Sequence, residues 1–326
     1  MISRVAESCF WLNRHMERVE CHARFLGVNQ SFVLDVNLAE TERWRPLVVI
    51  LGEEAQFTKL HGAALLDDAE TVQQYLTWSE GTSSSIWSSV FWARENARTI
   101  RETVSLEMWE TINALWLWLN AKPAQQLFRR DRNEFYTQVR DYAIRYQGHA
   151  MSTVLHGEAF DFMRLGTALE RAGLTARAMD MKYHTLGATR PGLEMPDESA
   201  QWLAVLRFCS GIEPFAKRRG TELSGLAVAD FLLFDPQFPR SVRHNLERAR
   251  NVLNRIRGSG KRARGVGSNE ALQRMLGHVR KLTMAKVMEQ GIHRQLTELI
   301  NETAEVCSLI HQEFFDPPVN RRSLPA

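Results

Sequence analysis

Residues 5–26 read VAESCFWLNRHMERVECHARFL, and apolar side chains recur in them at intervals of three and four. This spacing places the apolar side chains in one stripe along an α-helix, which is buried against other helices. The stripe consists of Val5, Cys9, Leu12, Met16, Val19, Ala23 and Leu26. The segment therefore predicts a long amphipathic helix near the start of the chain.

The same pattern returns in the middle of the chain around a second Glu-Arg pair. The first pair lies in Met16-Glu17-Arg18, which is followed by Ala23-Arg24. At a constant offset these residues align with Leu169-Glu170-Arg171, which is followed by Ala176-Arg177. The stripe is repeated as Phe162, Leu165, Leu169, Ala172, Ala176 and Met179. A duplicated helical unit is the simplest explanation. We expect a single domain with pseudo-repeats at about residues 1–150 and 151–315, and a flexible tail at 316–326.

Helical periodicity extends over most of the remaining chain, while alternating strand patterns are scarce. The nearest to a strand is Pro46–Leu51, which is short. Further helices are predicted at Ser84–Val104, Glu107–Asn120, Ala124–Gln147, Ala159–Tyr183, Ala200–Phe208, Arg240–Ile256, Glu270–Met288 and His293–Phe314. Breaks rich in Gly, Pro or basic residues fall at 186–196 and 258–268. We predict an all-α, multi-helix bundle.

The overall composition narrows the class of protein. A net charge of +3, from 41 basic and 38 acidic side chains, gives no general attraction for nucleic acid. The four cysteines are scattered, which favours a reducing compartment. The first residues lack the apolar core of a signal peptide, and the longest apolar stretch is short of the ~20 residues of a membrane span. We expect a cytoplasmic protein with no membrane partner.

The Glu-Arg pairs are the main candidates for function. Neighbouring residues on a helix point about 100° apart, so Glu17 and Arg18 cannot both face one ligand directly. Glu17 shares a row with Arg24, and its counterpart is the row of Glu170 and Arg177. One interpretation is structural, because Glu and Arg often pair across packed helices. The other is a polar cleft in which Glu17 and Glu170 are catalytic and arginines bind anions.

Two further groups of arginines are candidate anion-binding residues. Arg94, Arg98 and Arg101 share one helix face beside Trp92 and Trp109, although a solvated face with ion pairs explains them equally well. Arg240 and Arg243 follow Pro239 at the start of a predicted helix, where an anion is favoured. Structural capping is the alternative there. Arg18, Arg24, Arg171 and Arg177 complete the predicted anion-binding set.

Other chemistries find little support in the sequence. The basic residues at 240–264 suggest RNA binding, but aromatic side chains for base stacking are absent from that segment. No zinc-protease, phosphate-loop, nucleophile-elbow or dinucleotide motif is found. His15 and His22 share a helix face without a third ligand nearby in sequence. We therefore expect no metal site and no cofactor.

Several blocks along the chain resemble one family. They are Ser3–Ser8 with Trp11-Leu12 and Met16-Glu17-Arg18, then residues 93–98, 107–110, 157–160, 169–172 and 235–243. Together they are similar to the alpha-E family, an all-helical domain described by a Glu-Arg motif. Two features depart from the repeat: Asn13 stands where Gly166 leads us to expect a glycine, and Cys21-His22 is confined to the first copy.

The resemblance implies a pathway. Alpha-E proteins accompany circularly permuted ATP-grasp proteins and transglutaminase-like peptidases, and some are fused to them. ATP-grasp enzymes form amide bonds through acyl-phosphates. Our leading hypothesis is thus an accessory or catalytic component of an ATP-grasp-linked, amide-bond-forming pathway. Its Glu/Arg-lined cleft would bind an anionic peptide-like intermediate or the partner enzyme. The alternative is a non-catalytic helical scaffold in which the Glu-Arg pairs are structural.

Overall fold

The computed structural model describes residues 1–36, 38–82, 84–186, 196–220, 223–258 and 264–316, and these contain helices but no strand. The prediction of an all-α protein is confirmed. The first half holds α1 (Ser3–Asp35), α2 (Glu40–Arg43), α3 (Arg45–Ile50), α4 (Glu54–His61), η1 (Ala63–Asp67), α5 (Ala69–Trp78), α6 (Ile86–Thr99), α7 (Leu106–Leu119), α8 (Lys122–Arg130) and α9 (Arg132–Ser152). The second half holds α10 (Glu158–Leu186), α11 (Pro196–Phe208), α12 (Ile212–Arg219), α13 (Gly225–Phe234), α14 (Val242–Arg257), α15 (Val266–Lys281), α16 (Met284–Gln290), α17 (Ile292–Ile310) and η2 (His311–Phe315).

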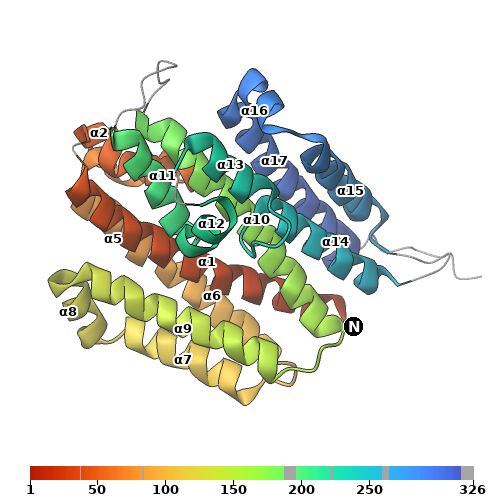
Figure 1. Ribbon diagram of the computed structural model, residues 1–326. Helices are drawn as coiled ribbons and strands as arrows, with labels where there is room; N and C mark the ends of the chain where they lie inside the picture. The colour runs from red at the N-terminus through yellow and green to blue at the C-terminus, as the bar shows by residue number, and fades with distance from the viewer. Residues whose placement is uncertain (37, 83, 187–195, 221–222, 259–263, 317–326) are drawn as a thin grey trace, which may run out of the picture.

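The two long helices with the Glu-Arg pairs, α1 and α10, pass through the middle of the molecule and pack on each other (Figure 1). Helices α6 and α9 cover α1, and α7 packs on both of them. Helices α14 and α17 cover α10, and α15 packs on both of these. Each central helix thus packs on one side against helices from its own half of the chain and on the other side against the other central helix.

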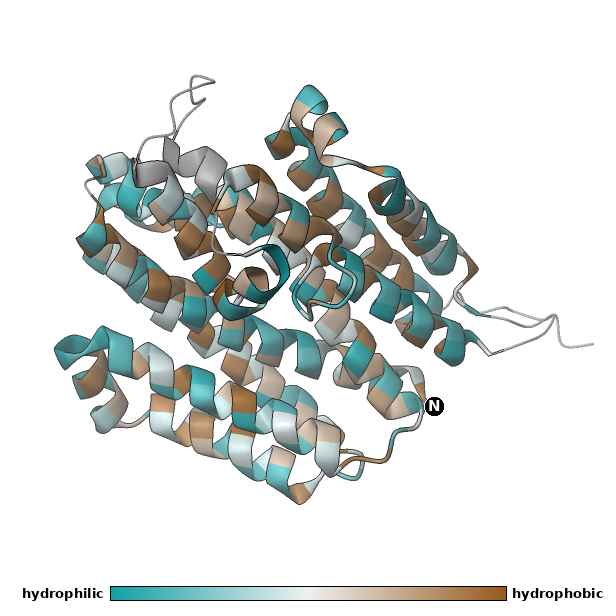
Figure 2. Ribbon diagram, in the orientation of Figure 1, coloured by the Kyte–Doolittle hydropathy of each residue, from teal (hydrophilic) through white to brown (hydrophobic). Residues whose placement is uncertain are grey.

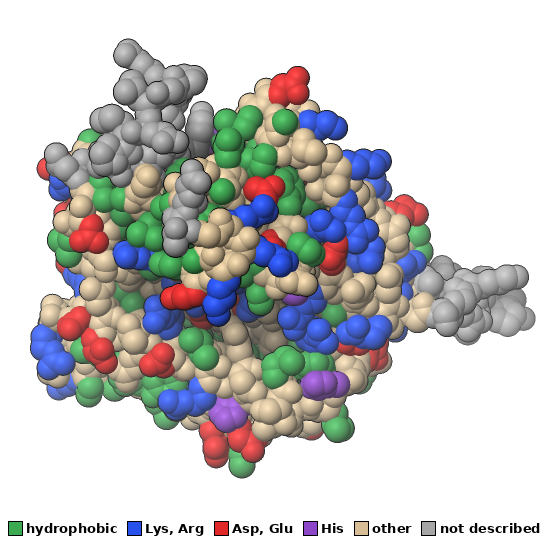
Figure 3. Space-filling model, viewed as in Figure 1, with side chains coloured by type: hydrophobic (Ala, Val, Ile, Leu, Met, Phe, Trp, Pro, Cys, Tyr) green, Lys and Arg blue, Asp and Glu red, His purple; other side chains and the backbone are tan. Residues whose placement is uncertain are grey.

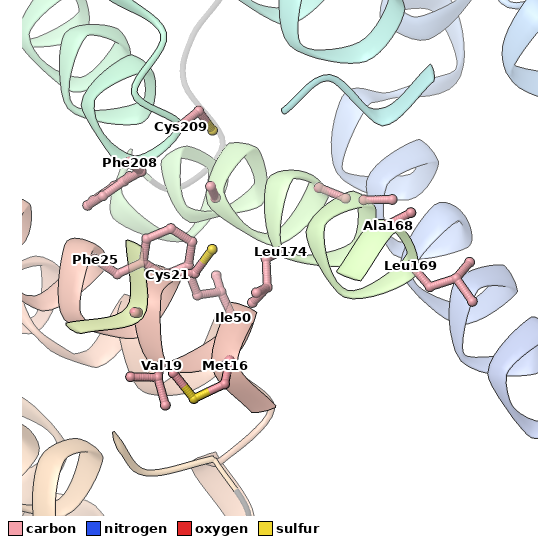
Figure 4. Packing of buried hydrophobic residues seen from close by; sticks show 14 of the residues in the cluster. Met16, Val19, Cys21, Phe25, Ile50, Ala168, Leu169, Leu174, Phe208 and Cys209 are labelled. Carbon is pink, nitrogen blue, oxygen red and sulfur yellow. The ribbon is translucent and has the colours of Figure 1, made fainter. Parts of the chain in front are cut away.

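The predicted stripe on α1 is confirmed, since its residues from Cys9 to Leu26 are buried. In Figure 2 hydrophobic and hydrophilic residues are interspersed along the helices, as expected of amphipathic helices. Figure 4 shows the apolar side chains between α1, α10 and α11, where the rings of Phe25 and Phe208 are 5.1 Å apart. One continuous hydrophobic core therefore packs the two central helices against each other.

A close approach fixes the position where α1 and α10 cross. A Cβ atom added at Gly166 would overlap the carbonyl oxygen of Phe10, so only glycine fits there. At the matching position of α1, the Asn13 side chain donates to Thr167 Oγ1 at 3.3 Å. Asn13, which departs from the predicted repeat, thus makes a polar contact between the same two helices.

Some predicted boundaries were wrong. The helix expected at Glu270–Met288 is divided between α15 and α16, because Leu282 and Thr283 are extended and the Thr283 side chain caps α16. Pro46–Leu51, the segment nearest to a strand pattern, belongs mostly to α3, where Pro46 fits the first turn. The predicted break at 186–196 and the predicted tail fall largely at 187–195 and 317–326, outside the described residues. Of the predicted break at 258–268, residues 259–263 lie outside the described residues, and α15 already begins at Val266.

The lengths and hydropathy of the helices also bear on membrane insertion. Among the residues described, no helix combines the length and the apolar character that a membrane span requires.

Candidate functional site

The two Glu-Arg motifs bind each other reciprocally across the α1–α10 interface. Arg171 of α10 donates to both carboxylate oxygens of Glu17 on α1, at 2.7 and 2.5 Å. In return, Arg18 of α1 donates to Glu170 of α10 at 2.8 Å. The adjacent Glu and Arg of each motif therefore point into different clusters, as the predicted angle between neighbouring residues requires.

The first cluster surrounds Glu17, whose side chain is fully buried. Arg240 reaches it from the segment before α14, with Nη1 3.3 Å from Glu17 and Nη2 2.7 Å from Glu20. Arg24 forms an ion pair with Glu20. Burial raises the pKa of Glu17, but the charges of Arg171 and Arg240 outweigh that effect and hold the pKa below its usual value. Glu17 is therefore a carboxylate enclosed by guanidinium groups.

The second cluster surrounds Glu170. Arg14 and Arg18, one turn apart on α1, each donate to one of its oxygens at 2.8 Å. Burial raises the pKa of Glu170, but the charges of Arg18 and Arg14 and their hydrogen bonds lower it far below the usual range. Glu170 is thus held ionised, like Glu17.

The two clusters differ in that the second one opens into a cavity of about 180 Å³. The cavity lies between α1, α10 and α17, with Leu51 and Ser84 on its border. Its polar and charged lining consists of Arg14, Arg18, His22, Ser84, Glu170, Arg177, Thr303 and Cys307. Among the described lining residues three guanidinium groups thus face one carboxylate, and the charge of Asp180 acts on Arg177 from outside the lining.

The two remaining titratable groups of the cavity do not change this balance. Burial, followed by the charge of Arg18, lowers the pKa of His22 to about 3, so its imidazole is neutral at physiological pH. Burial raises the pKa of the Cys307 thiol, which stays protonated. Among the described residues the buried Nδ1 of His22 has no hydrogen-bond partner. The cavity therefore offers guanidinium donors, one fixed carboxylate and one neutral imidazole.

The predicted site residues divide between several locations. Arg18, Glu170 and Arg177 line the cavity, where Arg177 also donates to the carbonyl oxygen of Ile50. Four other predicted residues belong to the first cluster: Glu17, Arg24, Arg171 and Arg240. None of these four lines the cavity.

The other four predicted arginines lie elsewhere on the surface. Arg94 and Arg98 pair with Glu95, and Arg94 also donates to Asn113. Arg101 lies over the Trp109 ring, and Arg243 pairs with Glu247. On the face shown in Figure 3, basic side chains gather around α14, which carries Arg243 and most of the basic segment 240–264.

Sequence reasoning missed four polar residues of the cavity: His22, Ser84, Thr303 and Cys307. Arg14, noted only as a neighbour of Arg18 in its row, is a fifth. Arg14, Arg18 and His22 follow one another at intervals of four on α1, and this row was the available signal. Thr303 and Cys307 come from α17, far along the chain, and no local pattern connects them with α1.

Two groups of side chains among the described residues have the composition of a metal site. One is Glu17, Glu20 and Cys21 in the first cluster, and the other is His278, Glu298 and Glu302 between α15 and α17. In the first group the guanidinium of Arg240 contacts both carboxylates, which opposes binding of a cation there. Burial raises the pKa of Cys21 to about 12, so a thiolate ligand is also disfavoured.

Comparison with known proteins places this geometry in a family context. Residues 1–315 match the model of Alpha-E, described as a predicted alpha-helical domain with a conserved ER motif. The "Uncharacterized protein Rv2567" of Mycobacterium tuberculosis and the "Uncharacterized protein Mb2597" of Mycobacterium bovis are each 26% identical over 313 residues. The match covers 91% of this chain and 35% of each relative, so the chain spans about a third of their length. No solved structure matches the chain.

The family description and the structure agree on the distinctive feature. Glu17-Arg18 and Glu170-Arg171 are ER motifs, and they occupy the centre of the described fold. The chain belongs to the Alpha-E family.

Proposed function

We propose that this protein binds an anionic group of a peptide-like intermediate in the cavity between α1, α10 and α17. The observation that carries the proposal is the charge of the lining, in which Arg14, Arg18 and Arg177 face the single carboxylate of Glu170. Guanidinium groups bind carboxylates and phosphates with two parallel hydrogen bonds. Enclosure by three helices lowers the local dielectric constant and strengthens such contacts.

The two motif glutamates take different roles in this proposal. Glu170 faces the cavity and would attract an amine or ammonium group of the ligand. Its depressed pKa makes it a weak proton acceptor, because a general base works best with a pKa near the operating pH. Glu17 is enclosed, and we assign it to the frame that holds α1 and α10 together. In this assignment the first cluster fixes how α1 and α10 pack, and that packing positions the arginines and Glu170 of the second cluster.

The pathway is the one implied by the family resemblance. We propose that the chain serves an ATP-grasp-linked, amide-bond-forming system as an accessory or catalytic component. Its partners would be a circularly permuted ATP-grasp protein and a transglutaminase-like protein. The length of the mycobacterial relatives supports association with a further domain, since most of each relative lies outside the matched region.

The proposed duplication explains why the site lies at the α1–α10 interface. Two copies of one Glu-Arg helix that cross each other can satisfy each carboxylate with the arginine of the other copy. The reciprocal pairs Glu17–Arg171 and Glu170–Arg18 support this origin.

Direct titration tests the binding proposal. Isothermal titration of the full chain with inorganic phosphate, acetate and glutarate should give saturable binding of at least one of these anions. Arg18→Gln and Arg177→Gln should each weaken it at least tenfold, and Arg45→Gln should leave it unchanged. Arg45 is the matched control because it is half-exposed and pairs with Glu54 outside the cavity. Absence of saturable binding to the wild-type chain would overturn the proposal.

Reconstitution tests the pathway. Adding the chain to a circularly permuted ATP-grasp protein from the same organism should increase ATP-dependent amide formation, measured as product and as released phosphate. The Arg177→Gln variant should lose that increase while retaining a native circular-dichroism spectrum.

The second candidate function is the non-catalytic scaffold. The observation that favours it is the burial of both motif glutamates between arginines of the opposite helix. A scaffold predicts that cavity variants change neither anion binding nor amide formation and act only on the melting temperature. The two experiments above therefore distinguish the candidates.

A further inference from the structure

The two sides of the α1–α10 interface are built from residues at matching positions of the two helices. The first cluster contains Glu17, Glu20, Cys21 and Arg24 of α1 with Arg171 and Thr175 of α10. The cavity side contains Glu170, Gly173, Leu174 and Arg177 of α10 with Arg18 and His22 of α1. Every residue of the first set corresponds to one of the second at the same offset along the chain.

One substitution distinguishes the two sides electrostatically. Glu20, whose side chain is fully buried in the first cluster, corresponds to Gly173 on the cavity side. In the first cluster three arginines share two carboxylates: Arg240 lies 2.7 Å from Glu20, and Arg24 is paired with it. On the cavity side Glu170 is the one carboxylate among the described lining residues, while Asp180, whose charge also acts on Arg177, lies outside the lining and contacts His293. The cavity therefore lacks one carboxylate at the position of Gly173.

Space for that carboxylate is present. A Cβ atom built on Gly173 meets nothing closer than Thr303 Cγ2 at 3.8 Å, which is an ordinary van der Waals contact. A cavity needs roughly 10–15 Å³ to hold one water, so about 180 Å³ accepts a group of several heavy atoms. A side chain at position 173 would thus extend into open volume.

We propose that the ligand supplies this missing carboxylate. The ligand is a small carboxylic acid, or the carboxylate of a peptide-like molecule, which binds over Gly173 and is held by Arg18 and Arg177. It occupies the place that the Glu20 side chain fills on the other side. This inference rests on the anion-binding function proposed above and adds the class of ligand, a carboxylate in preference to a phosphoryl group.

The chain allows the missing group to be restored covalently. Gly173→Glu places a tethered carboxylate in the cavity, and its spacing from Glu170 equals that of Glu20 from Glu17. Gly173→Gln is the matched control, because Gln has nearly the same volume and helix propensity but no charge. Gly173→Ala retains most of the cavity. We expect the Glu variant to melt a few degrees above the Gln variant, which for a chain of this size is a stabilisation of only about 1–2 kcal/mol.

Binding measurements complete the experiment. In calorimetric titrations at equal ionic strength, acetate and glutarate should bind the wild-type chain at least tenfold more tightly than inorganic phosphate. Gly173→Ala should retain carboxylate binding, and Gly173→Glu should lose it by at least tenfold.

The possible failures are distinguishable. Phosphate binding without carboxylate binding would overturn the ligand class and leave the anion-binding function standing. Binding of neither would overturn both. A Glu variant that melts no higher than the Gln variant, or that does not fold, would overturn the placement of the carboxylate over Gly173.

Discussion

Glu17 and Arg171 lie 154 positions apart in the chain, yet Arg171 donates two hydrogen bonds to Glu17, one to each carboxylate oxygen. This bidentate pair and the Glu170–Arg18 pair join the two central helices from opposite sides of their interface. Such buried pairs define geometry more than they add stability, because desolvation offsets much of the attraction. Their removal has consequences that can be measured.

Loss of the Glu17 charge should destabilise the fold strongly. Glu17→Gln leaves Arg171 partly buried without its carboxylate and Arg240 with Glu20 alone, and breaking a buried pair by removing one partner costs about 3–5 kcal/mol. Glu54→Gln, at the half-exposed pair with Arg45, should cost under about 1 kcal/mol. Urea denaturation followed by circular dichroism measures both. Equal effects of the two substitutions would contradict the structural role of Glu17.

Enlarging Gly166 should separate the central helices. Gly166→Ala brings a methyl group into the carbonyl oxygen of Phe10 and should destabilise the protein by about 2 kcal/mol, within the range for overpacking. Gly148 lies inside α9 with open space around it, so Gly148→Ala should stabilise by about 0.5–1 kcal/mol. Denaturation midpoints of the two variants should move in opposite directions, and movement in the same direction would contradict the close approach.

Arg240 should be required to hold the pKa of Glu17 as low as it is. Arg240→Met removes one positive charge that lowers the pKa of Glu17, and should destabilise the protein by about 3 kcal/mol at pH 7. The pKa of Glu17 in the folded variant should rise above its wild-type value. The destabilisation should therefore shrink as the pH falls through the pKa of Glu17 in the variant, since the wild type loses more stability than the variant when Glu17 is protonated.

A neighbouring residue provides the comparison for Arg240. Arg243→Met, at the partly exposed pair with Glu247, should cost under about 1 kcal/mol, so its pH dependence should be smaller than that of Arg240→Met. Unfolding free energies from urea titrations between pH 3 and 8 test this. A pH-independent loss in Arg240→Met would show that packing, and not charge, is what Arg240 supplies.

Acid sensitivity should arise at His22. The pKa of this residue falls from 6.5 in the unfolded chain to about 3 in the fold, through burial and then the charges of Arg18 and Arg177 opposed by Glu170. A lowered pKa means that the unfolded state takes up the proton first. The stability is therefore complete above pH 6.5 and is lost as the pH falls from 6.5 towards 3.

The size of this effect follows from proton linkage. One such histidine contributes a slope of about 1.4 kcal/mol per pH unit between roughly pH 6 and 4. His22→Gln should reduce the slope of unfolding free energy against pH by that amount, whatever its effect on stability at pH 7. His15, whose pKa is also lowered to about 3, remains in this variant and supplies a similar slope of its own. An unchanged slope in His22→Gln would contradict a neutral, buried His22.

Local sequence was sufficient to predict the helical class and the buried stripe of α1, because helix periodicity is a property of neighbouring residues. It also predicted that Glu17 and Arg18 diverge. Local sequence did not predict where α15 ends and α16 begins, because one capping threonine, Thr283, interrupts an otherwise continuous helical pattern. Helix boundaries depend on such single residues, and the apolar periodicity does not register them.

The sequence by itself determined that two similar amphipathic helices each carry a Glu-Arg pair whose members point in different directions. Only the tertiary structure decided which arginine each glutamate binds, that Arg240 fills one side of the interface, and that a cavity remains on the other. The physical reason is that partner choice depends on how α1 and α10 cross, and the crossing is fixed by contacts remote in the chain. Gly166 against Phe10 is one of them, and α17 supplies the wall of the cavity.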